Sequence, residues 1–122
     1  MTSKPLFVLV VEDEAIIRLS LVDELEDAGF RVAEAGTADE ALTVLEAHPE
    51  ITAIFTDIDM PGSMDGLKLA HRVHRAHPHV ALLLTSGYLK IPKNDLPVKV
   101  PFLPKPYEVG HVVNHLRDLV LQ

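Results

Sequence analysis

Five polar side chains stand where apolar runs of the sequence end, and together they could do phosphoryl chemistry. They are Glu12, Asp13, Asp57, Thr85 and Lys105. Three carboxylates that lie close together repel one another unless a cation lies among them, and a hard divalent cation such as magnesium prefers oxygen ligands of this kind. Beside such a cation, Asp57 could attack phosphorus and carry an acyl phosphate. Thr85 and Lys105 would then hydrogen-bond or neutralise the phosphoryl oxygens.

These side chains can meet only if the chain brings the ends of its apolar runs to one place. Short β-rich runs predict strands over residues 6–11, 31–35, 51–56, 80–85 and 100–103. Helical periodicity predicts helices over 14–28, 37–48, 65–77 and 108–121. The alternating order predicts an α/β fold, a doubly wound parallel sheet with helices on both faces. Ligands of such sheets bind beyond the carboxyl ends of the strands, where the five side chains fall.

Local signals mark several ends of these elements. Thr37-Ala38-Asp39-Glu40 is a capping box that would begin the second helix, and Gly29 is a plausible stop for the first. One segment breaks the pattern, because Tyr88 to Val100 should hold a helix but contains Pro92 and Pro97. Proline inside a helix costs about 3 kcal/mol. We therefore expect the fourth helix to be short or irregular.

The composition limits the class of protein. The chain has 122 residues, so residues 1–122 are expected to form one domain. Its formal charge of −7 disfavours nucleic acid and negatively charged membrane surfaces as partners. The absence of cysteine excludes disulfides and thiolate metal sites. No run has the length and character of a signal peptide or a membrane span, so a cytoplasmic location is expected.

Four motifs carry a resemblance to a known family. They are Val10-Val11-Glu12-Asp13-Glu14, Asp57-Ile58-Asp59-Met60-Pro61-Gly62, Leu84-Thr85-Ser86-Gly87 and Leu103-Pro104-Lys105-Pro106. In this order and spacing they resemble the receiver domain of two-component response regulators, over essentially the whole chain. The resemblance implies a flavodoxin-like fold, a five-stranded parallel sheet in the order 2-1-3-4-5. It also implies a signalling phosphoacceptor that catalyses only its own phosphorylation and dephosphorylation, and not an enzyme in the usual sense.

The resemblance implies a role for each residue of the site. Asp57 would be the phosphoacceptor, while Thr85 and Lys105 would contact the phosphoryl group. The ligands of a Mg²⁺ ion would be Glu12, Asp13, Asp57 and the backbone carbonyl of Asp59. The Lys105–Pro106 peptide bond would be cis.

Two further residues have an implied or unusual role. Phe102 falls at the aromatic switch position of the family, which turns inward as Thr85 moves, although a core aromatic explains Phe102 equally well. Asp59 is an acid where many receivers have a neutral residue. It adds negative charge near the phosphoryl group and could alter dephosphorylation, with a sign that the sequence leaves open.

The resemblance also names the kind of partner. The phosphoryl donor would be a phosphohistidine of a histidine kinase or of a histidine phosphotransfer protein. No output domain is recognised after the last helix, so a stand-alone receiver that signals by protein–protein contacts is expected. Origin from a larger protein such as a hybrid kinase, and homodimer formation, are left open. Nucleic acid and membranes are not expected as direct partners. Tyr88 to Val100 puts the usual signalling face of the family in question, so partners could contact a loop there instead.

Two other functions and one other site fit parts of the sequence. Asp57-Ile58-Asp59 also fits haloacid-dehalogenase-like phosphohydrolases, but those carry the pattern on their first strand and in longer chains. A degenerate receiver would act as an unphosphorylated binding module, against which the complete set of acids, Thr85 and Lys105 argues. The sequence contains no Gly-rich phosphate loop, so ATP is not expected as the direct phosphoryl donor. The histidines at 71, 74, 77, 79, 111 and 115 have metal-like spacings, but a solvated face explains them better.

Overall fold

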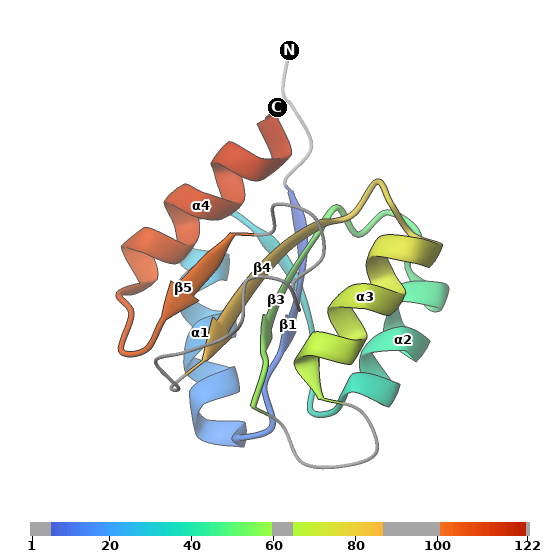
Figure 1. Ribbon diagram of the computed structural model, residues 1–122. Coiled ribbons are helices and arrows are strands. Elements are labelled where there is room, and N and C mark those ends of the chain that lie inside the picture. Colours follow the sequence, from blue (N-terminus) through green and yellow to red (C-terminus); the bar gives the residue numbers. More distant parts are fainter. Residues whose placement is uncertain (1–5, 60–64, 87–100, 122) are drawn as a thin grey trace.

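A computed structural model describes residues 6–59, 65–86 and 101–121 (Figure 1). The strands are β1 (Phe7–Val11), β2 (Arg31–Ala35), β3 (Ala53–Asp57), β4 (Ala81–Ser86) and β5 (Phe102–Pro104). The described helices are α1 (Ala15–Asp27), α2 (Ala38–Ala47), α3 (Gly66–Ala76) and α4 (Val109–Leu121). Each predicted strand and helix in these ranges is confirmed, with ends shifted by one or two residues. The expected irregular fourth helix falls in 88–100, outside the described residues.

The five strands form one sheet in the order β2-β1-β3-β4-β5, and every neighbouring pair is parallel. This confirms the predicted order. The register pairs Val11 with Thr56, Asp57 with Thr85, and Thr85 with Leu103. Because all strands run the same way, their carboxyl ends lie at one edge of the sheet, the lower edge in Figure 1. The groups that follow the strands are therefore brought together by the topology alone.

Helices cover both faces of the sheet, α1 and α4 on one side and α2 and α3 on the other (Figure 1). Every residue of β1 and β3 is buried, which is why these strands are continuously apolar in sequence up to the polar groups at their ends. Side chains of β1 alternate between the two faces. Leu9 and Val11 belong to the cluster under α2 and α3, and Val8 and Val10 to the cluster under α1 and α4.

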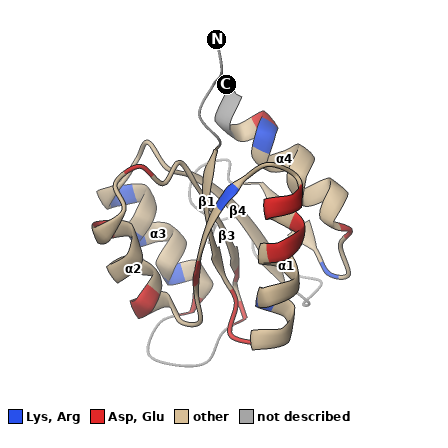
Figure 2. Cartoon of the chain, turned by 180° about the vertical axis from the view of Figure 1, so that it is seen from behind, with Lys and Arg blue, Asp and Glu red and all other residues tan. Residues whose placement is uncertain are grey.

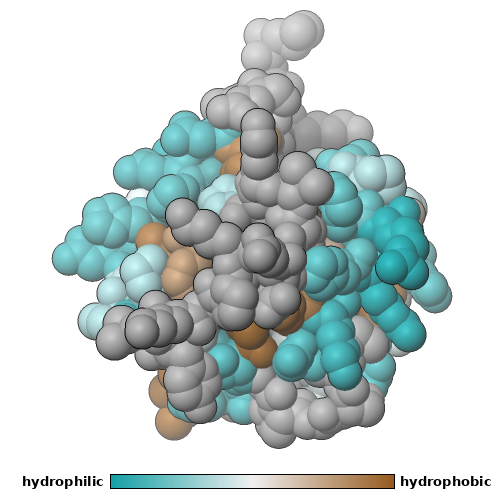
Figure 3. All heavy atoms as spheres, viewed as in Figure 1, coloured by the Kyte–Doolittle hydropathy of each residue, from teal (hydrophilic) through white to brown (hydrophobic). Residues whose placement is uncertain are grey.

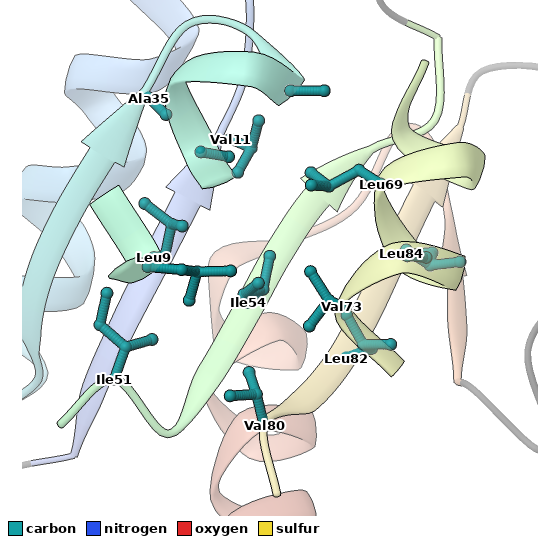
Figure 4. Packing of buried hydrophobic residues seen from close by; sticks show 14 of the residues in the cluster. Leu9, Val11, Ala35, Ile51, Ile54, Leu69, Val73, Val80, Leu82 and Leu84 are labelled. Atoms are coloured by element: carbon teal, nitrogen blue, oxygen red, sulfur yellow. The ribbon is translucent and has the colours of Figure 1, made fainter. Parts of the chain in front are cut away.

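Figure 4 shows the first of these clusters, with Leu9, Ile54 and Leu84 from the sheet meeting Leu69 and Val73 from α3. All five side chains are completely removed from solvent. Burying a side chain of this size contributes about 1.5–3 kcal/mol relative to leaving it exposed. The two clusters fix α1, α3 and α4 against the sheet, and so they fix the loops at its lower edge.

The helix ends follow their sequence signals. The Thr37 side chain accepts a hydrogen bond from the backbone N–H of Glu40 at 3.1 Å, as the capping box predicts. Asp65 caps α3 in the same way, accepting from the N–H of Lys68 at 2.9 Å. Gly29 has φ of 99°, the left-handed conformation that ends a helix at little cost for glycine. In the described part of the chain, no helix is both long and apolar enough to cross a membrane.

Candidate functional site

The predicted acidic residues meet at the carboxyl edge of the sheet. Glu12 and Asp13 directly follow β1, and Asp57 is the last residue of β3. Figure 2 shows acidic residues gathered at the lower ends of these two strands. Since Val11 pairs with Thr56, the next residues along the two strands, Glu12 and Asp57, are neighbours. Glu12 and Asp57 are buried, with exposed fractions of 3% and 4%, while Asp13 is exposed.

Both carboxylate oxygens of Asp57 have a partner. Oδ1 accepts a hydrogen bond from the backbone N–H of Asp59 at 2.9 Å. Oδ2 lies 2.5 Å from Nζ of Lys105, which is the residue immediately after β5. The Asp57 side chain is thus held in one orientation by a backbone donor on one side and a cation on the other.

Lys105 reaches both buried acids. Its Nζ also lies 3.9 Å from Oε1 of Glu12, and its backbone N–H donates to the carbonyl of Ser86 at 3.0 Å. Burial alone would lower the pKa of Lys105, but its hydrogen bond with Asp57 and the charges of Asp57 and Glu12 outweigh that effect and raise it. Lys105 is therefore a cation in the pocket. The expected cis bond between Lys105 and Pro106 is confirmed.

The pKa of Glu12 is raised by its surroundings in the pocket. Burial and the neighbouring charge of Asp57 raise the pKa of Glu12 from 4.5 to about 7, against the opposing charge of Lys105. Its Oε2 accepts a hydrogen bond from the backbone N–H of Asp13 at 3.0 Å. Burial is the larger cause of this shift, and the charge of Asp57 adds to it. A cation placed among these acids would favour the ionised form of Glu12.

The three acids fit a divalent cation. One carboxylate oxygen from each of Glu12, Asp13 and Asp57 lies within 4.8 Å of the others, and no other such group of three occurs in the described residues. When all three acids are ionised, their negative charges exceed the one positive charge of Lys105. One divalent cation would neutralise the remaining negative charge. Hard oxygen donors of this type suit Mg²⁺ or Ca²⁺. The acidic cluster predicted from the sequence is thus confirmed as a candidate cation site.

Thr85 faces this pocket with an unused hydroxyl group. It lies opposite Asp57 in the β3–β4 register and is 2% exposed. Its Oγ1 is buried and makes no hydrogen bond. An unsatisfied buried hydroxyl costs about 1–3 kcal/mol, so a group that supplied an acceptor here would gain that amount. Phosphoryl oxygens attached to Asp57 would be such acceptors.

Ser86 is a residue of the site that the sequence interpretation missed. Its Oγ donates a hydrogen bond to Oδ2 of Asp59 at 2.6 Å, and its side chain is 1% exposed. This pairing joins the end of β4 to the residue two positions beyond Asp57. Ser86 stands in the motif with Thr85, but its partner follows from the three-dimensional register and not from any local signal.

Two other residues shape the site without having been predicted. Arg18 of α1 donates from Nη1 to the backbone carbonyl of Glu12 at 2.8 Å and from Nε to Glu34 at 2.9 Å, so it ties the loop after β1 to β2. Gly66 begins α3, and a Cβ atom there would lie 2.0 Å from the carbonyl oxygen of Asp57. The only sequence signal for Gly66 is its place directly after the capping Asp65.

The proposed switch residue Phe102 is half-buried and packs against the cluster under α2 and α3. It pairs with Leu84, the residue before Thr85. This position agrees with the core aromatic interpretation and is close enough to Thr85 for the switch interpretation, which stays a prediction.

An apolar groove borders the pocket on the side of α1 and α4. It has a volume of about 620 Å³ and is lined by residues that include Ile16, Ile17, Lys105, Pro106 and Tyr107. The side chain of Ile16 is 85% exposed and that of Leu19 is 53% exposed. Figure 3 shows apolar atoms at the lower left of the molecule, beside the start of α1. Lys105 belongs to both the groove and the acidic pocket.

The histidines do not form a metal site in the described residues. His71, His74, His79, His111 and His115 are exposed, and His77 is half-buried. The rings of His77 and His79 pack edge to face with centroids 6.1 Å apart. The surface around α3, at the right in Figure 3, is strongly hydrophilic. A solvated face agrees with these positions.

Comparison with known proteins places this chain in one family. Residues 8–117 match the response regulator receiver domain family. The response regulator receiver protein CpdR of Brucella abortus is 30% identical over 93% of this chain and 96% of CpdR. The sensor kinase CckA of the same organism is 32% identical over 93% of this chain, but that alignment spans only 12% of the kinase.

Solved structures agree on the fold. A response regulator receiver protein from Sinorhizobium medicae superposes with a TM-score of 0.89 and 24% identity, covering 97% of this chain and 96% of that one. The chain belongs to the response regulator receiver domain family, the receiver module of two-component phosphorelay signalling, and the expected resemblance is confirmed. Asp57 stands at the position that the family pattern gives to its phosphoacceptor.

Proposed function

We propose that this receiver accepts a phosphoryl group on Asp57 from a phosphohistidine of a partner protein. The observation that carries the proposal is the geometry around Asp57. Its carboxylate is buried, aimed by the Asp59 N–H and the Lys105 ammonium, and faced by the unpaired hydroxyl of Thr85. Phosphoryl transfer requires a nucleophile and groups that donate hydrogen bonds to the phosphoryl oxygens, and this site offers both.

The transfer step uses these residues in complementary ways. A carboxylate oxygen of Asp57 bonds to phosphorus while the phosphorus–nitrogen bond of the phosphoimidazole breaks, and the imidazole leaves with the electron pair of that bond. Lys105, which already contacts Asp57, balances the charge of the transferred oxygens. Thr85 donates its free hydroxyl hydrogen to one of them. Both contacts stabilise the product as well as the transition state.

Glu12, Asp13, Asp57 and the backbone carbonyl of Asp59 would hold a Mg²⁺ ion in this site. When bound, the ion would screen the charge of the acids and of the phosphoryl oxygens. The support for this assignment is the closeness of the three carboxylates and the raised pKa of Glu12. The role of Asp57 as nucleophile also requires this screening, since an incoming phosphoryl group is itself negatively charged.

The apolar groove beside Lys105 is the surface that we assign to the phosphoryl donor protein. A donor must bring its phosphohistidine within bonding distance of Asp57, so its surface must cover the rim of the pocket. The groove shares Lys105 with that pocket, and the strongly exposed Ile16 lies on it. Apolar rims of this kind are ordinary anchor points for protein partners. A histidine kinase or a histidine phosphotransfer protein fits this requirement.

The direct test measures intact mass after incubation with Mg²⁺ and a small-molecule phosphodonor. We expect the wild-type protein to gain one phosphoryl group, with no gain for Asp57→Asn or in the presence of a chelator. Asp65→Asn is a matched control, because Asp65 is an acid of the same edge that caps α3 and lies outside the pocket. Absence of phosphorylation in the wild type under all these conditions would refute the proposal and favour an unphosphorylated binding module.

A further inference from the structure

The side-chain carboxylate of Asp59 has no role in the phosphoryl transfer proposed above. Glu12, Asp13 and Asp57 form the cation cluster, whereas Asp59 contributes only backbone groups to the proposed chemistry. Its backbone N–H nevertheless touches Oδ1 of Asp57, so its side chain starts beside the reacting carboxylate. A half-buried acid in this position must either face the phosphoryl group or be held away from it.

The structure shows how it is held. The hydroxyl of Ser86 donates to Oδ2 of Asp59 at 2.6 Å, and the Ser86 side chain is almost completely buried. Ser86 is itself fixed, because it pairs with Pro104 in the sheet and its carbonyl accepts from the N–H of Lys105 at 3.0 Å. Hydrogen bonds to a charged acceptor are about twice as strong as neutral ones. The carboxylate of Asp59 is thus anchored to a rigid strand end.

We propose that Ser86 is a positioning residue that anchors the Asp59 carboxylate to β4 and thereby lengthens the lifetime of the phosphoryl group on Asp57. The inference rests on the proposed phosphorylation of Asp57. In hydrolysis, the oxygen of a water molecule bonds to phosphorus and the bond from phosphorus to the Asp57 carboxyl oxygen breaks. Asp57 leaves as a carboxylate, and the product is inorganic phosphate.

A free carboxylate beside the phosphoryl group would help that reaction. It could orient the attacking water and accept the proton that the water loses, a contribution of at most about 10²–10⁴ when the base is ideally placed. Ser86 limits this role in two ways, since it occupies Oδ2 and fixes the direction of the carboxylate. Loss of the Ser86 hydroxyl would leave the same acid in place but remove this anchor on Oδ2, so that the carboxylate could turn toward phosphorus more readily.

The test compares dephosphorylation rate constants in a double-mutant cycle. The wild type, Ser86→Ala, Asp59→Asn and the double variant are phosphorylated with a small-molecule donor, the donor is removed, and the loss of the phosphoryl mass is followed with time. We expect Ser86→Ala to lose the phosphoryl group about three- to tenfold faster than the wild type. In the Asp59→Asn background, Ser86→Ala should cause no acceleration, because the acid that it releases is absent.

Thr52→Val is the control for simple loss of a hydroxyl hydrogen bond. Thr52 donates to the carbonyl of Phe7 at 3.2 Å, at the opposite edge of the sheet, so this variant should leave the lifetime unchanged. An unchanged or slower rate in Ser86→Ala, or an acceleration that persists without the Asp59 carboxylate, would overturn the inference. A wild type that takes no phosphoryl group would instead overturn the proposed function, so the two failures are distinct.

Discussion

Lys105 Nζ lies 2.5 Å from Oδ2 of Asp57, although 48 residues separate the two along the chain. The contact spans two strand boundaries, from β3 across β4 to the end of β5. It places the cation of the site directly on the proposed nucleophile. Lys105 therefore has opposite effects on the two proposed events of the site: its positive charge opposes cation binding and supports phosphoryl transfer.

For this pair we predict that Lys105→Met slows phosphorylation by a small-molecule donor about 10²-fold, because the charge on the transferred oxygens loses its partner. The same change should tighten Mg²⁺ binding, since it removes a positive charge 3.9 Å from Glu12 and closer still to Asp57. Mass spectrometry and a Mg²⁺ titration measure the two effects. The surface variant Lys68→Met should change neither, and a loss of both activities in Lys105→Met would indicate structural damage instead.

Thr85→Val should separate stability from phosphorylation. Valine keeps the shape of threonine but removes the buried hydroxyl, whose Oγ1 has no partner. The unphosphorylated variant is therefore expected to be about 1 kcal/mol more stable than the wild type in urea denaturation. It should lose the extra stability that phosphorylation gives to the wild type. Thr85→Ser keeps the hydroxyl and should behave like the wild type in the phosphorylated state; a Thr85→Val protein that still gains stability on phosphorylation would contradict the assigned contact.

The raised pKa of Glu12 predicts how stability depends on pH in the absence of Mg²⁺. With a pKa of about 7 in the folded protein against 4.5 ordinarily, Glu12 binds its proton more tightly when folded. Its contribution is fully present below pH 4.5 and is lost as the pH rises from 4.5 through 7. We expect a loss of about 1–2 kcal/mol after allowance for screening by solvent.

Urea denaturation of the wild type and Glu12→Gln at several pH values measures this loss, and the difference between the two slopes isolates Glu12 from the other acids. Mg²⁺ should stabilise the wild type most above pH 7, where Glu12 is ionised and can bind the cation. Equal slopes for the two proteins would show that Glu12 does not carry the perturbed proton.

Gly66→Ala should destabilise the fold at the site itself. The added Cβ would lie 2.0 Å from the Asp57 carbonyl oxygen and 2.8 Å from Cα of Ile58, so backbone has to move. We expect a loss of about 2–3 kcal/mol and slower phosphorylation. Gly110→Ala is the matched control, since its added Cβ would have no atom within 4 Å apart from its chain neighbours and the backbone of its own helix. That change should raise stability by about 0.5–1 kcal/mol, and equal effects at the two glycines would argue against the close approach at Gly66.

The groove beside Lys105 predicts a difference between donors. Ile16→Ala removes an exposed apolar side chain from the surface assigned to the donor protein. Phosphotransfer from an autophosphorylated histidine kinase should slow about tenfold, while phosphorylation by a small molecule stays at the wild-type rate. His74→Ala, an exposed change on α3, serves as the control. Equal slowing with both donors would place Ile16 in the chemistry of the pocket and not in docking.

The sequence predicted most of the fold, since apolar runs, helical periodicity and the Thr37 capping box are local signals. It also predicted the acids, Thr85 and Lys105, because each lies within two residues of the end of a strand and the parallel topology brings those ends together. It could not predict the Ser86–Asp59 hydrogen bond or the contact of Arg18 with the Glu12 carbonyl. Those contacts depend on side-chain directions and on packing between elements, which no short sequence pattern encodes.

The acids of the pocket and Lys105 are attached to strands that differ in how firmly the sheet holds them. Glu12 and Asp57 follow or end β1 and β3, central strands with a neighbour on each side and no exposed residue. Lys105 follows β5, a three-residue strand that pairs only with β4 in the described sheet. Amide hydrogens of β1 and β3 should therefore exchange with solvent only in global unfolding, and those of β5 through smaller openings. A structural change that begins at Asp57 would accordingly be accommodated more easily at β5 and Lys105 than at β1.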